Sequence, residues 1–390
     1  MNRWDAFQFV CATLRASLAG RRLDIPSGVD WPGVVAQAGS HLVTPMMAPA
    51  LVDHADAPSD ARDYFAAVQT LTAQRSDLLH TQIGKITSVL RGAGVQPVLL
   101  KGAADLAQGL YRTRGVRLMV DIDVLVDGAK MEQTRDALSV CGYCQPGQPR
   151  ERRPFVSDTA SERPNGLAPV HEPRHDSPFF HEDTGVQVEL HRALSFPAFA
   201  ALLPANDALR RATPVSANGM QFSVLAPTDR IVHHIVHAQL HHQFAKSAIV
   251  DLRRLVDLAI LLDAFGREID WKDVEVRFAV NGHADVLADY LAYLAVLLNR
   301  HAPAHISDFE PFMARLRAGI EAPRDFEPVM AHLRSGVQAP FKPGEKIGTI
   351  ASEYWKRFRQ RPVLMINLLD LRFWPGRLRN WRDRMRPRYF

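Results

Sequence analysis

Apolar residues recur at helical spacing before residue 90 and again after residue 227. In AVQTLTAQRSDLLHTQIGKITSVLRGAG they return every three or four positions, and the stretch closes on two glycines, as helices often do. DRIVHHIVHAQLHHQFAK and DLRRLVDLAILLDAFG show the same spacing further along the chain. The pattern therefore predicts two helical regions that are separated by a segment of different character.

Strand patterns occupy much of that middle segment. A short apolar run at 98–100 follows a proline and closes on a Lys-Gly pair, and a longer run covers 118–126. Further along, TGVQVELHRAL alternates strictly between apolar and polar residues, which is the period of a strand with one buried face. We predict strands at these three places and helices at 103–110 and 129–140 beside them.

This arrangement predicts an α+β protein with a small mixed sheet that is flanked by helical regions. The segment 145–185 is rich in Pro, Arg, Ser and His, and it reads as a long loop inserted into the sheet-forming part. The predicted parts are an N-terminal helical region at 1–90, an α/β core at 91–200 that contains the insertion, a C-terminal helical domain at 201–345 and a basic, aromatic-rich helical tail at 346–390.

The composition is that of an ordinary soluble protein. A chain of 390 residues with 47% hydrophobic and 23% charged residues is long enough for two or three domains. No stretch reaches the roughly 18 to 20 continuous apolar residues that a membrane span needs. Three cysteines give no disulfide framework. We therefore expect a cytoplasmic protein without a membrane span.

Positive charge is concentrated in the last forty residues. The segment 351–390 holds one lysine and ten arginines against three acidic residues, a net charge of +8, whereas the rest of the chain carries about −3. Aromatic residues are interspersed with these charges, as in helices that lie on membrane surfaces. An acidic membrane surface, a polyanion such as a nucleic acid, and a solvated helix packed on the protein body are the three interpretations of this tail.

Two carboxylates inside the second predicted strand are the main candidates for chemistry. Asp121 and Asp123 are two positions apart, so their side chains share one face of the strand, while Ile122 and Val124 lie on the other. Glu189 adds a third carboxylate if its strand is a neighbour. Such a cluster is repulsive unless it binds divalent cations, and Mg²⁺ prefers oxygen ligands. Two such ions hold the attacking and leaving oxygens of a phosphoryl transfer.

A glycine at a strand-to-helix junction supplies the second part of a phosphoryl-transfer site. In LLKGAA, backbone N–H groups at the start of the helix face an anion, and Gly102 lets a phosphate approach closely. Positive charge near this glycine comes from Lys101, Arg112, Arg114 and Arg117.

Together these motifs resemble a known family. LLKGAADL, YRTRGVRLMVDIDVLV and VQVELH are similar to the motifs of the uncharacterised nucleotidyltransferase group within the DNA polymerase β superfamily. That group has KG followed by small residues, an arginine shortly before D-I-D, and a later acidic-hydrophobic-His strand. HHIVHAQLHHQ and LRRLVDLAILL resemble its helical region. The resemblance runs, with gaps, from about residue 30 to about residue 265.

The resemblance implies a nucleotidyltransferase that moves a nucleoside monophosphate from a nucleoside triphosphate (NTP) to an acceptor. Asp121, Asp123 and Glu189 would hold two Mg²⁺ ions, for which Mn²⁺ is an alternative, and Glu189 would assist deprotonation of the acceptor. A protein, a peptide, a sugar and another small molecule are all compatible as acceptors. The resemblance assigns nucleotide phosphate binding to Lys101, Gly102, Ala103 and Arg117, with Ala103 in place of the superfamily's usual serine.

Histidines after residue 230 leave further interpretations open. His233, His237 and His241 are four residues apart and line one helix face. They border the cleft, where Arg112, Arg114 and His191 are other candidate contacts, or make polar contacts between helices, or bind a metal. The alternatives to a nucleotidyltransferase are a catalytically weak nucleotide- or polyanion-binding module and a metal-dependent phosphohydrolase built on this histidine helix.

Overall fold

The computed structural model covers most of the chain between residue 2 and residue 321. Two predicted segments fall mainly or entirely outside the described residues, namely the insertion at 145–185 and the tail at 346–390. The described residues are 2–145, 178–181, 183–241, 250–301 and 310–321. No helix among them is long and apolar enough to cross a membrane.

The chain divides into two compact units, and one long helix contributes residues to both. The first unit lies within residues 1–73 and 308–390, and the second within 74–307. The long helix is α4 (Ser59–Gly92). The four-part division that the sequence suggests stays a prediction.

All regular secondary structure in the described part of the first unit is helical. Asn2 caps the first helix by accepting a hydrogen bond from the backbone N–H of Asp5, whose carboxylate accepts one from the Asn2 N–H in return. Side chains such as Phe7, Leu14 and Met47 are buried. Besides part of α4, the unit contains α1 (Arg3–Ala19), α2 (Trp31–Ser40), α3 (Thr44–Leu51) and α13 (Glu310–Glu321), and α1 packs against the other three.

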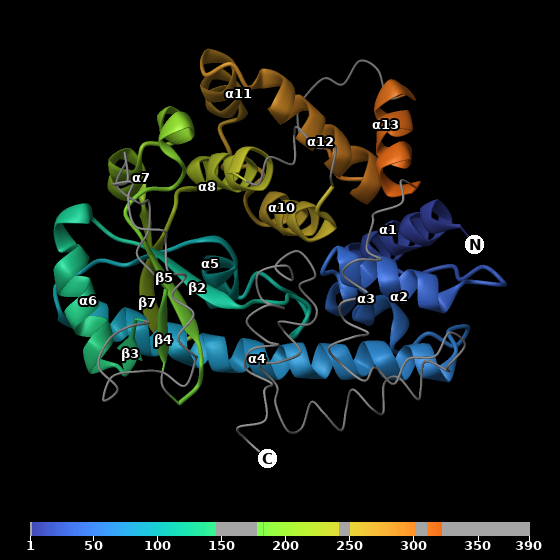
Figure 1. The fold of residues 1–390 in the computed structure, drawn as a ribbon, viewed down its shortest axis with the longest axis horizontal. Coiled ribbons are helices and arrows are strands. Elements are labelled where there is room, and N and C mark those ends of the chain that lie inside the picture. Colours follow the sequence, from blue (N-terminus) through green and yellow to red (C-terminus); the bar gives the residue numbers. More distant parts are fainter. Residues whose placement is uncertain (1, 146–177, 182, 242–249, 302–309, 322–390) are drawn as a thin grey trace, which may run out of the picture. The chain divides into compact units, whose positions relative to one another are not determined.

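A seven-stranded mixed sheet forms the centre of the second unit (Figure 1). Two pairs of neighbouring strands run parallel and four pairs run antiparallel. The strands are β1 (Val98–Leu99), β2 (Asp121–Leu125), β3 (Tyr143–Cys144), β4 (Phe179–His181), β5 (Gln187–His191), β6 (Thr213–Ala217) and β7 (Met220–Val224), in the order β3-β4-β5-β2-β1-β7-β6.

Helices pack on both sides of this sheet. Figure 1 shows α4 along one side, whereas helices from the later part of the chain lie on the other. The helical segments of this unit after α4 are α5 (Lys101–Gln108), η1 (Gly128–Lys130), α6 (Met131–Val140), η3 (Pro197–Leu202), α7 (Ala205–Arg211), α8 (Pro227–Ile235), the π-helical η4 (Val236–His241), α10 (Leu252–Phe265), α11 (Trp271–Val280) and α12 (Ala284–Leu298).

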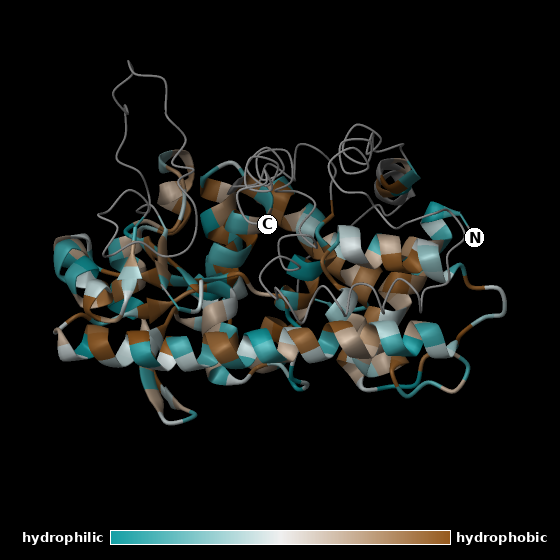
Figure 2. Cartoon of the chain, turned by 60° about the horizontal axis from the view of Figure 1, so that its bottom comes forward, coloured by the Kyte–Doolittle hydropathy of each residue, from teal (hydrophilic) through white to brown (hydrophobic). Residues whose placement is uncertain are grey.

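The core of the second unit lies under one face of the central strands. Ile122 and Val124 of β2 and their register partners Val188 and Leu190 of β5 are completely buried. α4 supplies an apolar stripe to this core, and Figure 2 shows hydrophobic and hydrophilic residues alternating along the helix. Its buried members are Leu79, Ile83, Ile86 and Leu90. The α+β prediction is therefore confirmed, and the polar face of β2 and β5 is turned away from this core.

The hairpin formed by β6 and β7 lies within the region for which only helices are predicted. Its turn is Asn218-Gly219, and both residues have positive φ, 52° and 74°. Asn-Gly is the commonest sequence for a two-residue hairpin turn, because both positions need left-handed backbone. β7 then pairs with β1 in parallel and extends the sheet beyond the predicted strands.

Candidate active site

The register between β2 and β5 determines which polar side chains meet. The two strands are parallel neighbours, and Asp123 is paired directly with Glu189. Two residues further along, Leu125 is paired with His191, and two residues in the other direction Asp121 is paired with Gln187. Because residues two apart point to the same face of a strand, these polar side chains all lie on the face opposite the core.

Three of these side chains bring potential metal ligands together. One ligand atom each from Asp123, Glu189 and His191 lies within 4.8 Å of the others. His191 Nε2 is 2.7 Å from Asp123 Oδ1 and 3.8 Å from Glu189 Oε2. Glu189 Oε1 accepts a hydrogen bond of 2.9 Å from Gln187 Nε2. The side chains of Asp123 and His191 are only 7% and 2% exposed, whereas Glu189 is 19% exposed and reaches solvent.

Lys101 contacts the same carboxylate from the start of α5. Its Nζ donates a hydrogen bond of 2.6 Å to Asp123 Oδ1. The segment is anchored to β2 because the Leu100 N–H donates to the backbone carbonyl of Asp123 at 3.0 Å. Burial raises the pKa of Asp123, but the Lys101 charge and the hydrogen bonds from His191 and Lys101 lower it more, so this pKa lies well below its usual value.

Asp121 lies on the same face as Asp123 but contributes no atom to this three-residue donor cluster of the described residues. Burial raises its pKa, and the negative charge of Asp123 raises it further, against the opposing effect of Lys101. The two aspartates of the D-x-D pair are therefore electrostatically different, since Asp123 is held ionised and Asp121 is held closer to neutrality.

Arg117 forms an ion pair with a residue of the helical region. Its Nε and Nη2 donate to the two carboxylate oxygens of Asp257 in α10 at 3.1 and 2.7 Å, and Nη1 donates to the Leu118 carbonyl at 2.8 Å. The guanidinium also packs against Gly102, where a Cβ would meet Arg117 Cζ at 3.1 Å and Met119 Sδ at 3.2 Å. Gly102 is thus required for the packing of this arginine, whatever approaches α5 from the other side.

Three other predicted contact residues, Ala103, Arg112 and Arg114, differ in their surroundings. Ala103 is buried in the hydrophobic core, and its N–H donates to the Leu100 carbonyl at 3.2 Å. Arg112 and Arg114 are exposed, and Arg114 forms an ion pair with Asp77 of α4. Of the predicted phosphate-binding residues, Lys101 contacts the carboxylate cluster directly.

The histidine helix lies beside this site. His233 of α8 is 4% exposed; burial lowers its pKa far below the usual value, and the charges of Lys101 and His191 lower it further. Its ring centroid is 6.1 Å from that of His237 in the π-helical η4. His241 ends η4, and its side chain lies outside the described part of the chain. Within the described residues, none of these histidines joins a metal-type donor cluster.

A buried polar network that the sequence did not reveal surrounds α5. Asp105 forms an ion pair with Arg230 of α8, and the two side chains are 5% and 6% exposed. The Tyr111 hydroxyl lies 3.2 Å from Asp105 Oδ2 and 3.4 Å from Asp257 Oδ1, so it connects this pair to the Arg117 ion pair. The only sequence signal for these partners is their charge inside apolar helical patterns, and such a signal does not say which residues pair.

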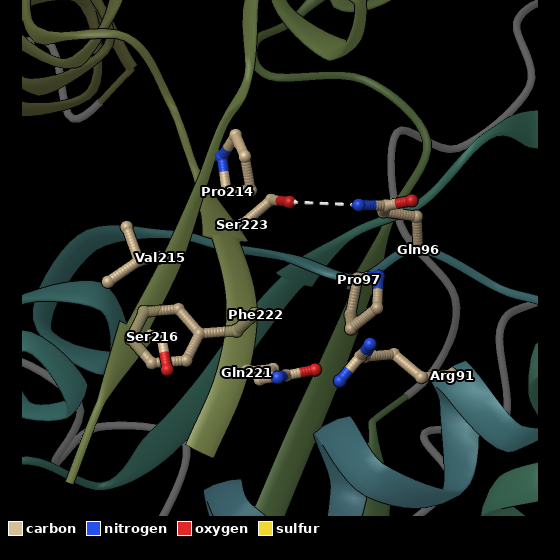
Figure 3. Close-up of a pocket in the computed structure, with 9 residues that line it drawn as sticks. All are labelled: Arg91, Gln96, Pro97, Pro214, Val215, Ser216, Gln221, Phe222 and Ser223. Atoms are coloured by element: carbon tan, nitrogen blue, oxygen red, sulfur yellow. Dashed lines mark hydrogen bonds between the residues drawn. The ribbon is translucent and has the colours of Figure 1, made fainter. Parts of the chain in front are cut away.

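The cavity shown in Figure 3 lies away from the carboxylates. It has a volume of about 260 Å³ and lies between the start of β1 and the β6–β7 hairpin. Gln96 at its rim donates from Nε2 to Ser223 Oγ at 3.4 Å. Gln96 precedes β1 whereas Lys101 follows it, so this cavity and the cluster around Asp123 lie at opposite ends of the strand.

Comparison with protein-family models matches residues 27–299 to a family described as uncharacterised nucleotidyltransferase. The chain belongs to this family. It is therefore a nucleotidyltransferase, an enzyme that transfers nucleotidyl groups, and one substrate is a nucleotide. Comparison with curated proteins and with solved structures gave no significant match.

The donor set of this nucleotidyltransferase fits a divalent cation. Two carboxylates and an imidazole converge within 4.8 Å, and carboxylate oxygens are the ligands that Mg²⁺ and Mn²⁺ prefer. Asp123 is buried, and its Oδ1 already contacts the Lys101 ammonium and His191, so a cation at this position would share or replace these partners.

Proposed function

We propose that this nucleotidyltransferase uses Mg²⁺ or Mn²⁺ to transfer a nucleoside monophosphate from an NTP to an acceptor hydroxyl. The observation that supports this most is the pairing of Asp123 with Glu189 across two parallel strands, with Lys101 and His191 on the same carboxylate oxygen. These residues supply anionic ligands for a cation and a cationic side chain for a phosphate in one place.

The metal-binding groups in this proposal are Asp123 and Glu189, with Asp121 as the further carboxylate of a two-ion site and His191 as an additional donor. When bound, divalent cations neutralise charge on the triphosphate and stabilise the departing pyrophosphate. Asp121 is partly exposed at the start of β2, next to the pair formed by Asp123 and Glu189, and this position suits a second ion.

The residues of the chain perform the remaining tasks. The acceptor oxygen attacks the α-phosphorus, an O–P bond forms, and the bond between the α-phosphorus and the bridging oxygen breaks to release pyrophosphate. The acceptor proton passes to the carboxylate of Glu189, which reaches solvent and is oriented by Gln187. Lys101 at the first turn of α5 holds the triphosphate oxygens.

Acceptor choice is assigned in this proposal to the helical side of the site. His233 is close enough to Lys101, His191 and Asp123 for their charges to shift its pKa. The π-helical η4 begins directly after the helix that carries His233, and π-helical segments are frequent at functional sites. A protein, a peptide, a sugar and another small molecule remain the acceptor classes. A cytoplasmic location and contact of the tail at 351–390 with an acidic membrane or polyanion stay predictions from the sequence.

The test is to incubate the full chain with each NTP labelled at the α-phosphate, Mg²⁺ and a cell extract as the source of acceptor. We expect label to move to an acceptor, and we expect Asp123→Asn and Glu189→Gln to slow this transfer by about a hundredfold or more. Asp136→Asn and Glu132→Gln are matched controls, because both side chains are exposed on α6.

Four results would contradict the proposal. If no NTP yields labelled acceptor, or if Asp123→Asn transfers label as fast as the wild type, the transferase assignment to this cluster is wrong. Movement of a γ-phosphate label would instead indicate kinase-like chemistry. Loss of metal in His237→Ala, with metal retained in Asp121→Ala, would favour a phosphohydrolase built on the histidine helix.

A further inference from the structure

Lys101 has an unusual backbone conformation at the start of α5. Its φ is +50°, in the left-handed region that residues other than glycine rarely adopt. The preceding residue, Leu100, is extended, and its N–H is bonded to the Asp123 carbonyl. This conformation costs free energy, and such strain persists where the surrounding structure fixes it, often at functional sites. Here it accompanies an ammonium group directed at Asp123.

The Lys101 ammonium and a metal ion have the same preferred ligand. Asp123 Oδ1 is 2.6 Å from Lys101 Nζ and 2.7 Å from His191 Nε2. This carboxylate also belongs to the donor cluster with Glu189 and His191. A divalent cation bound by Asp123 would lie within a few ångströms of the ammonium, and like charges at that separation repel strongly when side chains are 14% and 7% exposed.

We infer that Lys101 exchanges Asp123 for the triphosphate when substrate binds, so that the site takes up a divalent cation together with an NTP rather than the cation alone. The inference rests on the proposed function for its substrate. Phosphate oxygens supply the ammonium with a new anionic partner, which removes the repulsion that opposes the cation. Cation and nucleotide therefore bind with positive coupling, and by linkage each increases the affinity for the other.

The coupling has a consequence that a purely structural ion pair does not have. Removing the ammonium should tighten the binding of the free cation, since one competitor for Asp123 is lost. The same change should weaken transfer, since the triphosphate loses a cationic contact. A lysine that only stabilised the fold would affect both quantities in the same direction or leave cation binding unchanged.

The experiment measures binding of Mn²⁺ to the full chain by electron paramagnetic resonance, with and without an α,β-methylene NTP analogue that cannot react. For Lys101→Met we expect binding of free Mn²⁺ to be at least about tenfold tighter than in the wild type, and the gain on adding the analogue to shrink. Lys130→Met is the matched control, because Lys130 is an exposed lysine of η1. It should keep wild-type binding and coupling.

Lys101→Gly is the second variant, because glycine adopts the positive φ without strain. It can be measured in the same way if the methionine variant does not fold. Free Mn²⁺ binding that is unchanged or weaker in the folded Lys101 variants overturns the inference, even if the wild type transfers α-phosphate label. Tighter Mn²⁺ binding with reduced coupling in these variants supports it. The same result together with a wild type that transfers no label contradicts the proposed function alone.

Discussion

The ion pair between Arg117 and Asp257 offers the sharpest test of how the site is held in place. Both side chains are almost completely buried, at 8% and 3% exposure, and two hydrogen bonds join them. Two unit charges about 4 Å apart attract by about 4 kcal/mol at an effective dielectric constant near 20. Desolvation of both charges offsets most of this attraction, so the intact pair contributes little net stability.

Replacing one residue of this ion pair should therefore lower the free energy of unfolding much more than replacing both. We expect Asp257→Leu to lower the free energy of unfolding by about 3–5 kcal/mol, because it leaves a buried guanidinium without a counter-charge. Arg117→Met should cost about 2–4 kcal/mol, since Asp257 keeps the Tyr111 hydroxyl at 3.4 Å and the nearby charge of Arg254. The double variant should lie within about 2 kcal/mol of the wild type.

Thermal and urea unfolding of the four proteins checks this expectation. For a unit of this size, a loss of 3–5 kcal/mol corresponds to a fall in melting temperature of roughly 6–20 °C. If the effects of the two single changes simply add in the double variant, the two charges do not interact as the geometry indicates. The same four proteins should be assayed for transfer, because a stable double variant with reduced activity would show that the pair also positions Gly102.

Three further predictions follow from individual contacts. Gly102→Ala should lower the free energy of unfolding by about 1–3 kcal/mol, because the added methyl group meets Arg117 Cζ at 3.1 Å. An unchanged melting temperature would contradict this packing. Asp229→Asn should lower the free energy of unfolding by about 2–4 kcal/mol, because this carboxylate is 1% exposed and accepts hydrogen bonds from Arg211 and Arg277. Asp273→Asn should lower it less, because that carboxylate is 37% exposed. The difference in unfolding free energy between the wild type and Asp257→Asn should shrink as the pH falls below about 4. Burial raises the pKa of Asp257 but Arg117 lowers it more, and a carboxylate whose pKa is depressed in the folded state loses its stabilising contribution in acid. A difference that does not change with pH would refute this prediction.

Local patterns in the sequence predicted the elements that carry the carboxylates. Strict alternation in the strand before residue 192 placed Glu189 on a polar face, and the D-x-D spacing placed Asp121 and Asp123 on another. The predicted run at 118–126 contains β2, and the predicted run at 98–100 contains β1. These predictions succeed because a strand's period depends only on neighbouring residues and on which side is buried.

What could not be predicted depends on contacts between distant residues. Arg117 pairs with a residue 140 positions away, and the sequence alone presents it as one more cation near a phosphate loop. The β6–β7 hairpin, in contrast, could have been predicted from the sequence, because Asn218-Gly219 between short alternating runs is a strong turn signal. No local pattern specifies the contact of Lys101 with Asp123, since it requires both the turn into α5 and the pairing of β1 with β2.

The Lys-Gly pair contacts two parts of the D-I-D motif region. Gly102 packs against the arginine that precedes D-I-D, and Lys101 contacts the second aspartate of the motif. Gly102 has no side chain where Arg117 packs, and this arginine is held by Asp257 in α10. The first turn of α5 is thereby fixed between β2 and the helical region, and its first residue, Lys101, reaches Asp123. On this reasoning the arginine acts on the proposed phosphate site through the position of α5. Its loss should then impair NTP binding even though the guanidinium hydrogen-bonds within the protein.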